Sequence, residues 1–285
     1  MDKNKKYFLS MYEKAVPDEL PLKEKLRLCK EFGFDGMEIS MDASDWRLAR
    51  LEWTKEEREA LKRDMEETGC PIYSMCLSGH RKYPLGSSDL NTEKRAKEIM
   101  EKAVDLAADL GIRIIQLAGY DEYANPSTPE TMKRFEDNLK WACELAAKKG
   151  VLMGFETMMD TECVNSCESA MRFVNACESV YLNVYPDIGN IKSVSLEKGF
   201  DVNEDLKKAK GHIVGCHLKE TLPGQDRDVP FGTGHTEYDR NLPVLKELGV
   251  RYFNGEFWRN GDNWKEDGIN SCKFLREKLD GVFKE

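Results

Sequence analysis

The sequence lacks a long apolar run: no segment approaches the roughly 18 residues that a membrane-spanning helix needs. Its opening residues, MDKNKKYFLSMYEKAVPDEL, contain neither the apolar stretch nor the small-residue cleavage site of a secretory signal. These absences argue against a membrane protein and a secreted protein. We therefore expect a cytoplasmic chain with no membrane partner.

The sequence also lacks an excess of positive charge. It has 43 Lys and Arg against 52 Asp and Glu, a formal net charge of −9, and the charges are spread along the chain. Binding along a nucleic-acid backbone needs clustered Lys and Arg, so a nucleic-acid partner is disfavoured. A small anionic substrate stays compatible with this composition, because a few local donors can hold one phosphate.

The nine cysteines lack the pattern of a disulfide or zinc framework. Their spacing is irregular, and only Cys163 and Cys167 lie close together, without a nearby histidine to complete a zinc site. A chain of 285 residues can bury a large core and does not need disulfides for stability. We expect reduced thiols, most of them buried.

No Walker sequence and no GxGxxG motif occurs. An open doubly wound sheet, the competing α/β architecture, usually shows a glycine-rich loop after its first strand. Here that place is taken by EKAVPDELP, which has no glycine. This absence disfavours a nucleotide-binding sheet.

A different pattern repeats along the chain, in which an amphipathic segment ends at a glycine and a short apolar run follows. The glycines are Gly33, Gly69, Gly111, Gly150, Gly211 and Gly249. Glycine takes the left-handed conformation that ends a helix, so each joint predicts a helix that leads into a strand. The segments 93–110 and 129–149 have helical apolar spacing.

Two further runs, YFLSMYE and VYLNVYPDIGN, bring the prediction to eight strands alternating with about eight helices. Strict alternation implies a parallel sheet, and eight units in a chain of this length predict an α/β fold of the (β/α)8 TIM-barrel type. We expect residues 1–285 to form one barrel domain. The irregular stretches 81–89 and 222–236 follow the third and seventh strands, on the face where barrel active sites form.

Four predicted strands end in a side chain that can bind a metal: Glu156, Asp187, His217 and Glu256. Their intervals of 31, 30 and 39 residues are about one β/α unit each, so a closed barrel would aim all four at one point above its mouth. Taken singly, each has a structural explanation, such as capping the next helix. Their recurrence favours one divalent ion (Mn²⁺, Zn²⁺, Co²⁺ or Mg²⁺), and no organic cofactor is expected.

A divalent ion between two glutamates suggests proton chemistry beside a carbonyl. The ion would polarise a ketone and stabilise an enediolate. One of Glu156 and Glu256 could remove the adjacent proton, and the other could return a proton to the opposite face. This arrangement predicts inversion of a stereocentre.

Several strings resemble one enzyme family: 37–53 (MEISMDASDWRLARLEW), 74–87 (SMCLSGHRKYPLGS), 112–121 (IRIIQLAGYD), 185–190 (YPDIGN) and 229–240 (VPFGTGHTEYDR). They resemble the L-ribulose-5-phosphate 3-epimerases, also called L-xylulose-5-phosphate 3-epimerases, of bacterial L-ascorbate and L-xylulose use. The likeness runs from about Tyr12 through Trp258. The loop 158–169 departs from the family pattern.

This resemblance implies a xylose-isomerase-like barrel with a divalent ion held by the positions of Glu156, Asp187, His217 and Glu256. It implies that Glu156 and Glu256 exchange the C3 proton, while the ion holds the O2 and O3 oxygens. The reaction would interconvert L-xylulose 5-phosphate and L-ribulose 5-phosphate. Which glutamate serves which epimer stays open.

The sugar-phosphate substrate needs further contacts around the barrel mouth. The residues expected to contact the phosphate, by their place after strands three and seven, are His80, Arg81, Lys219, Gly232 and Gly234. Those expected to orient a ligand or bind substrate hydroxyls are Glu38, Gln116 and Asn190. The alternative for each is packing or a solvated charge at the barrel rim.

Other functions stay open. An aldose–ketose (hexulose) phosphate isomerase would use the same ion, with the proton moving between C1 and C2. A barrel that binds a sugar phosphate without turnover is the non-enzymatic hypothesis. A zinc endonuclease of abasic-site repair would need a histidine-rich cluster and a basic groove, which four histidines at a net charge of −9 disfavour. Apolar residues on the outer helices are compatible with a homodimer.

Overall fold

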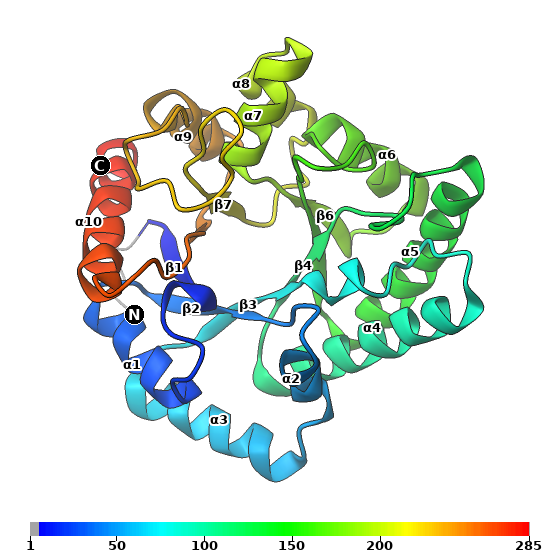
Figure 1. Cartoon of the computed structure of the whole chain (residues 1–285), viewed down its shortest axis with the longest axis horizontal. Coiled ribbons are helices and arrows are strands. Elements are labelled where there is room, and N and C mark those ends of the chain that lie inside the picture. The colour runs from blue at the N-terminus through cyan, green and yellow to red at the C-terminus, as the bar shows by residue number, and fades with distance from the viewer. Residues whose placement is uncertain (1–5, 285) are drawn as a thin grey trace.

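The computed structural model describes residues 6–284, and its centre is one sheet of eight parallel strands (Figure 1). The strands are β1 (Phe8–Tyr12), β2 (Gly36–Ser40), β3 (Ile72–Leu77), β4 (Ile114–Ala118), β5 (Leu152–Glu156), β6 (Leu182–Tyr185), β7 (Cys216–Leu218) and β8 (Tyr252–Gly255). They follow the order β6-β5-β4-β3-β2-β1-β8-β7. Parallel bridges between Val184 and Ile213 and between Asp187 and His217 join the two edges. The predicted TIM barrel is confirmed.

The helices form a ring outside the strands (Figure 1). They are α1 (Leu22–Glu31), α2 (Asp45–Leu48), α3 (Lys55–Thr68), α4 (Leu90–Leu110), α5 (Pro129–Lys149), α6 (Cys167–Cys177), α7 (Ile188–Lys198), α8 (Val202–Lys208), α9 (Tyr238–Glu247) and α10 (Trp264–Phe283), with short 3-10 turns η1 (Glu13–Ala15), η2 (Ala49–Glu52) and η3 (Ser78–Arg81). Phe32, just after α1, packs edge-on against Trp264 at the start of α10, which closes the ring. Within residues 6–284, no helix is both long and apolar enough to cross a membrane.

The predicted joints between helices and strands lie where the sequence placed them. All six predicted helix-ending glycines have positive φ, from +62° at Gly69 to +99° at Gly33. Helix α5 matches the predicted segment 129–149 at both ends, whereas α4 begins three residues before the predicted 93. The reason is Asp89, whose side chain accepts a hydrogen bond from the backbone N of Thr92 and caps the helix. All nine cysteines are free, and all but Cys177 are buried, as predicted.

The inside of the barrel is layered. An apolar cluster that includes Phe8, Tyr73, Ile114 and Val214 fills the end where the strands begin. Above it lies a hydrogen-bonded group that we call the polar layer: Ser10, Glu38, Ser74, Tyr185, Tyr252 and Asn254. Because side chains alternate along a strand, Leu9 and Met11 face the helices while Ser10 faces inward. The interior therefore becomes polar towards the carboxyl ends of the strands.

A buried ion network around Glu13 fixes the end of β1. Its carboxylate accepts hydrogen bonds from Arg50 Nη1 (2.6 Å) and Nη2 (2.7 Å), from Lys25 Nζ (3.0 Å), and from the backbone N of Ser40 at the end of β2 (2.9 Å). Burial alone would raise the pKa of Glu13, but Arg50 and Lys25 outweigh this effect and lower the pKa to about 2. The network thus ties two strand ends to the helical turns beside them.

Replacing Glu13 by Gln is expected to lower the free energy of unfolding at pH 7 by about 3–5 kcal/mol, because Arg50 and Lys25 lose their buried counter-charge. In the wild type, this stabilisation is present above the ordinary pKa of 4.5 and is lost as the pH falls towards about 2. Urea unfolding at pH 7 and pH 3 measures both effects. Glu24→Gln, in an exposed pair with Arg27, is the control and should leave the urea midpoint unchanged. Equal midpoints for the two variants would contradict the role of Glu13.

Candidate active site

The four sequence-predicted metal ligands converge at the mouth of the barrel. Glu156 ends β5, Asp187 lies between β6 and α7, His217 lies in β7, and Glu256 follows β8. One ligand atom from each lies within 4.8 Å of the others, and all four residues are buried. Residues about one β/α unit apart in the sequence therefore share one point in space.

Asp187 shows how the fold aims a ligand. Its Oδ1 atom accepts hydrogen bonds from the backbone N atoms of Gly189 (2.8 Å) and Asn190 (2.9 Å) and so caps α7. Its Oδ2 atom is buried, has no hydrogen-bond partner, and lies 4.0 Å from His217 Nδ1. One carboxylate oxygen thus caps α7. The other faces the cluster and is free to bind a cation.

His217 is surrounded by three glutamates. Its Nε2 atom lies 2.8 Å from Glu38 Oε1, and its Nδ1 atom lies 3.2 Å from Glu156 Oε1 and 3.7 Å from Glu256 Oε2. Gln116 Nε2 donates a hydrogen bond to the other oxygen of Glu156. Glu38 and Gln116 therefore contact ligand side chains from behind, and neither lines the open pocket.

Negative charge exceeds positive charge in this buried group. Lys219 Nζ lies 3.4 Å from Glu256 Oε2 and donates a hydrogen bond to Asn190 Oδ1 (3.0 Å). Burial alone would raise the pKa of Glu256, but Lys219 and His217 lower it to about 2. Burial raises the pKa of Asp187 well above its ordinary value. A divalent cation would relieve the repulsion between these carboxylates, and their free oxygens fit one.

Burial alone would lower the pKa of His217, yet the three surrounding glutamates outweigh it and hold that pKa well above 6.5. The imidazole thus responds to the same excess of negative charge as Lys219. A metal ion at Nδ1 would take the place of a proton there.

A pocket opens directly above the cluster, lined by Tyr12, Lys14, Cys76, Ser78, Arg81, Tyr123, Glu156, Met158, Met159, Asp160, Asn190, Lys219, Asp226, Arg227, Glu256 and Trp258. Arg81 lies over the rings of Tyr120 and Tyr123, 5.5 and 5.6 Å from their centroids, and its Nε atom is buried without a hydrogen-bond partner. Arg227 lies over the Trp258 ring at 4.9 Å. Positive charge therefore comes from the pocket lining at Arg81 and Arg227 and from Lys219 beside Glu256, while the lining also contains Asp160 and Asp226.

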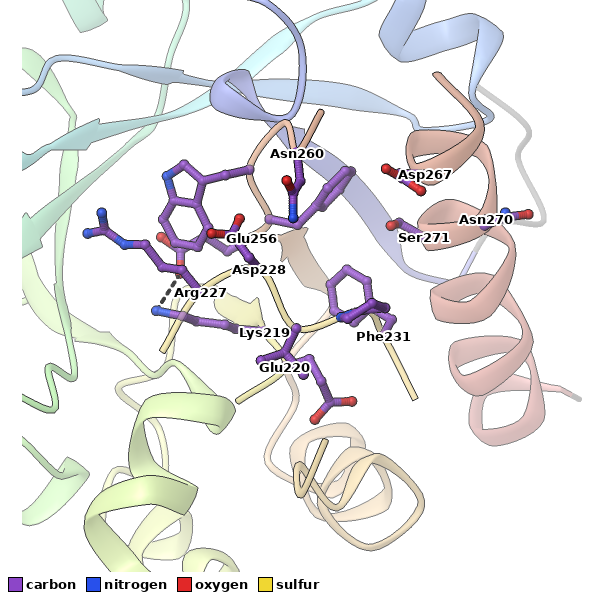
Figure 2. Close-up of a pocket in the computed structure, with 14 residues that line it drawn as sticks. Lys219, Glu220, Arg227, Asp228, Phe231, Glu256, Asn260, Asp267, Asn270 and Ser271 are labelled. Atoms are coloured by element: carbon purple, nitrogen blue, oxygen red, sulfur yellow. Dashed lines mark ion pairs between the residues drawn. The ribbon is translucent and has the colours of Figure 1, made fainter. Parts of the chain in front are cut away.

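A second groove adjoins this pocket and shares Lys219, Arg227, Glu256 and Trp258 with it (Figure 2). It runs under the loop 222–236 towards Asp267 and Ser271 on α10. Sequence reasoning marked this loop as irregular and near the site, but it missed Arg227 and Trp258. Nothing in their local sequence shows that two separate loops bring them together.

Three expected phosphate contacts do not face the pocket. His80 is buried, its Nε2 atom lies 3.2 Å from the carbonyl oxygen of Ala96, and burial lowers its pKa to about 4. The backbone N of Gly232 donates to the carboxylate of Glu220 (2.9 Å), so this site already holds an anion of the protein itself. A Cβ at Gly234 would lie 2.4 Å from the backbone oxygen of Thr221, because that glycine is packed against the chain just after β7. These positions correct the expectation for all three residues.

The other expected contacts lie at or near the ligand cluster. Arg81, Lys219 and Asn190 line the pocket, whereas Glu38 and Gln116 lie beneath it. Asn190 also donates a hydrogen bond to the backbone oxygen of Thr157 (3.0 Å), which fixes its amide beside Lys219. The fold thus brings together the residues that sequence reasoning singled out, and their roles as metal ligands and substrate contacts stay predictions.

Comparison with known proteins identifies the family. A family model described as a xylose isomerase-like TIM barrel matches residues 26–278. The L-ribulose-5-phosphate 3-epimerase UlaE of Escherichia coli (strain SE11) is 43% identical over 241 residues, which cover 85% of this chain and 83% of that protein. The chain belongs to the xylose isomerase-like TIM barrel family. The 43% identity over most of the chain confirms the resemblance to the L-ribulose-5-phosphate 3-epimerases and the predicted enzyme class, an isomerase that acts on carbohydrates.

Solved structures of this TIM-barrel type share the fold at low sequence identity. The crystal structure of D-psicose 3-epimerase in the presence of D-fructose has a TM-score of 0.80 and 16% identity, and the match covers 95% of this chain and 99% of that one. The IOLI protein with a binding zinc atom has a TM-score of 0.78 and 20% identity, with 98% and 100% covered. The barrel architecture is therefore common to proteins whose sequences have diverged widely.

Replacing Asp187 by Asn tests the metal site without removing the helix cap, because asparagine also caps helices well. We expect Zn²⁺ or Mn²⁺ to raise the unfolding temperature of the chelator-treated wild type by mass action and to leave that of D187N nearly unchanged. Asp201 caps α8 in the same way, through the backbone N atoms of Asn203 and Glu204, and Asp201→Asn is the matched control. An equal metal-induced shift in D187N and the wild type, measured by thermal unfolding, would rule out Asp187 as a ligand.

Proposed function

We propose that the protein interconverts L-xylulose 5-phosphate and L-ribulose 5-phosphate by exchanging the proton at C3. The observation that carries this proposal is the pair of buried glutamates, Glu156 and Glu256, at the two ends of the run of ligand strands from β5 to β8. The identity of 43% to an L-ribulose-5-phosphate 3-epimerase supports the substrate. The proposed place of the enzyme is bacterial use of L-ascorbate.

The chain's own side chains supply the proton transfers. Lys219 and His217 hold Glu256 as a carboxylate, ready to accept a proton. Gln116 fixes one oxygen of Glu156 and leaves the other turned to the cluster. In each direction one glutamate removes the C3 proton and the other delivers one to the opposite face. This pairing inverts C3 with no net change in the protonation of the enzyme over a full cycle.

One divalent cation, held by Glu156, Asp187, His217 and Glu256, completes the proposed site. When bound, it supplies the positive charge that polarises the C2 carbonyl and stabilises an enediolate. Three carboxylates and one imidazole suit Mn²⁺, Zn²⁺, Co²⁺ or Mg²⁺. The zinc in the IOLI structure supports a transition metal on this fold.

The Glu156→Gln variant tests the reaction. In D₂O with Mn²⁺, we expect the wild type to convert L-xylulose 5-phosphate to L-ribulose 5-phosphate with deuterium at C3, as followed by proton NMR. E156Q should lose conversion by at least about 10²-fold, because one of the two proton-transfer groups is gone. Exposed Glu162→Gln is the control and should keep full activity.

The alternative functions predict different products in the same NMR experiment. Deuterium at C1 with formation of an aldose would assign the site to an aldose–ketose isomerase. Binding of the sugar phosphate without exchange at any carbon would assign it to a non-catalytic barrel.

We further propose that Arg81 binds the substrate phosphate. Its guanidinium lines the pocket, lies over two tyrosine rings, and forms no ion pair with any residue between 6 and 284. A largely buried cation without a carboxylate partner is poised for an anion from outside, and its fork suits a phosphate. Lys219 lies between Asn190 and Glu256, which supports a role at the reacting end of the sugar.

Replacing Arg81 by Gln is expected to raise KM for the 5-phosphate by about 10–100-fold with a smaller effect on kcat, because a charge-assisted contact is worth roughly 1.5–3 kcal/mol. Activity on L-xylulose without phosphate should not change. The neighbouring Lys82 pairs with Asp45 outside the pocket, so Lys82→Gln is the control. Steady-state kinetics on both sugars would refute the assignment if R81Q and K82Q had the same KM.

A further inference from the structure

Glu38 lies in the middle of β2, fully buried, and both of its carboxylate oxygens are in use. Oε1 accepts a hydrogen bond from Asn254 Nδ2 (3.1 Å) and lies 2.8 Å from His217 Nε2. Oε2 accepts hydrogen bonds from Ser74 Oγ (2.5 Å) and Tyr185 OH (3.1 Å). Four polar groups thus surround the carboxylate, so Glu38 has no oxygen left for a metal or a sugar hydroxyl.

Burying a carboxylate at this position costs folding free energy. The interior of a TIM barrel is usually filled with branched apolar side chains, and burying an ionised carboxylate carries a large desolvation penalty. Within residues 6–284, Glu38 forms its ion pair with His217. The polar layer therefore keeps a buried charge whose charged partner is a candidate metal ligand.

The contact with Glu38 decides which nitrogen of His217 is free. A carboxylate that already takes three hydrogen bonds acts as an acceptor, so the proton on this side belongs to Nε2. The other nitrogen, Nδ1, lies 3.2 Å from Glu156 Oε1, 3.7 Å from Glu256 Oε2 and 4.0 Å from Asp187 Oδ2. Its lone pair would then face the candidate metal position.

We propose that Glu38 is a positioning residue that makes His217 a metal ligand through Nδ1, by holding the proton on Nε2 and fixing the ring. This inference rests on the divalent ion of the proposed function and not on the identity of the sugar. A carboxylate behind a ligating histidine orients the ring and strengthens it as a donor, and losing such a partner typically costs about 10–100-fold in metal affinity.

The first test determines which nitrogen of His217 carries the proton and which one binds the metal. Protein labelled with ¹⁵N-histidine and loaded with Zn²⁺, a diamagnetic ion, should show His217 with a proton on Nε2 and the metal on Nδ1. The sequence has four histidines, so single substitutions of His80, His212 and His235 assign the spectrum. Coordination of Zn²⁺ through Nε2 would overturn the proposal, whatever the behaviour of any Glu38 variant.

The second test measures Zn²⁺ affinity by competition with a chromogenic chelator. Glu38→Gln keeps an oxygen that can accept from Nε2 but loses the charge, and we expect its Kd to rise about 10-fold. Glu38→Ala loses both and should raise Kd about 100-fold. Ser74→Ala removes a different hydrogen bond to Glu38 and is the control, with an expected change of no more than about twofold.

Kd values within about twofold of the wild type for both Glu38 variants would overturn the proposal. A loss in S74A as large as in E38Q would also overturn it, because the polar layer as a whole would then be responsible. Neither test uses turnover. If the protein bound Zn²⁺ through Nδ1 but did not epimerise a pentulose phosphate, the proposed function would fail and the role of Glu38 would stand.

Discussion

The repulsion between buried carboxylates at the barrel mouth is the constraint on which the rest of the site depends. Glu156, Asp187 and Glu256 approach one another around His217 in a buried region beneath the pocket, with Lys219 as the one neighbouring lysine in the described residues that pairs with them. Like charges in a low-dielectric interior destabilise the folded protein unless a cation joins them. The eight strands supply the stiffness that holds the side chains there, and a divalent ion would supply the missing charge.

Residues beneath and above the carboxylate cluster support its geometry. The polar layer lies beneath the carboxylates and reaches the cluster through Glu38. Asp187 connects the cluster to α7. One of its carboxylate oxygens caps that helix, and the other faces the cluster without a hydrogen bond. Above, Arg81 and Arg227 rest on aromatic rings and bring positive charge to the pocket lining, which also contains Asp160 and Asp226. A sugar phosphate can then lie with its carbonyl end on the cluster and its phosphate among the cations, which is the orientation that the proposed C3 chemistry needs.

The sequence alone predicted the barrel and the ligand cluster because both follow the β/α repeat. The glycine joints mark where helices end, and the four ligands recur at about the same period, so their meeting point follows from closure of the sheet. The phosphate contacts follow no such period. His80 and Arg81 are adjacent in η3, yet one turns to the carbonyl of Ala96 and the other to the pocket. Which side each takes depends on helix packing that a sequence does not display.

The most direct test of the central claim, that these four residues hold one divalent ion, is anomalous diffraction from crystals of the full chain grown with Zn²⁺. The account predicts one strong peak per chain, roughly 2.0–2.2 Å from an atom of each of Glu156, Asp187, His217 and Glu256. A chain with no peak at the barrel mouth, or with its zinc bound elsewhere, for example at the surface beside His235, would contradict it.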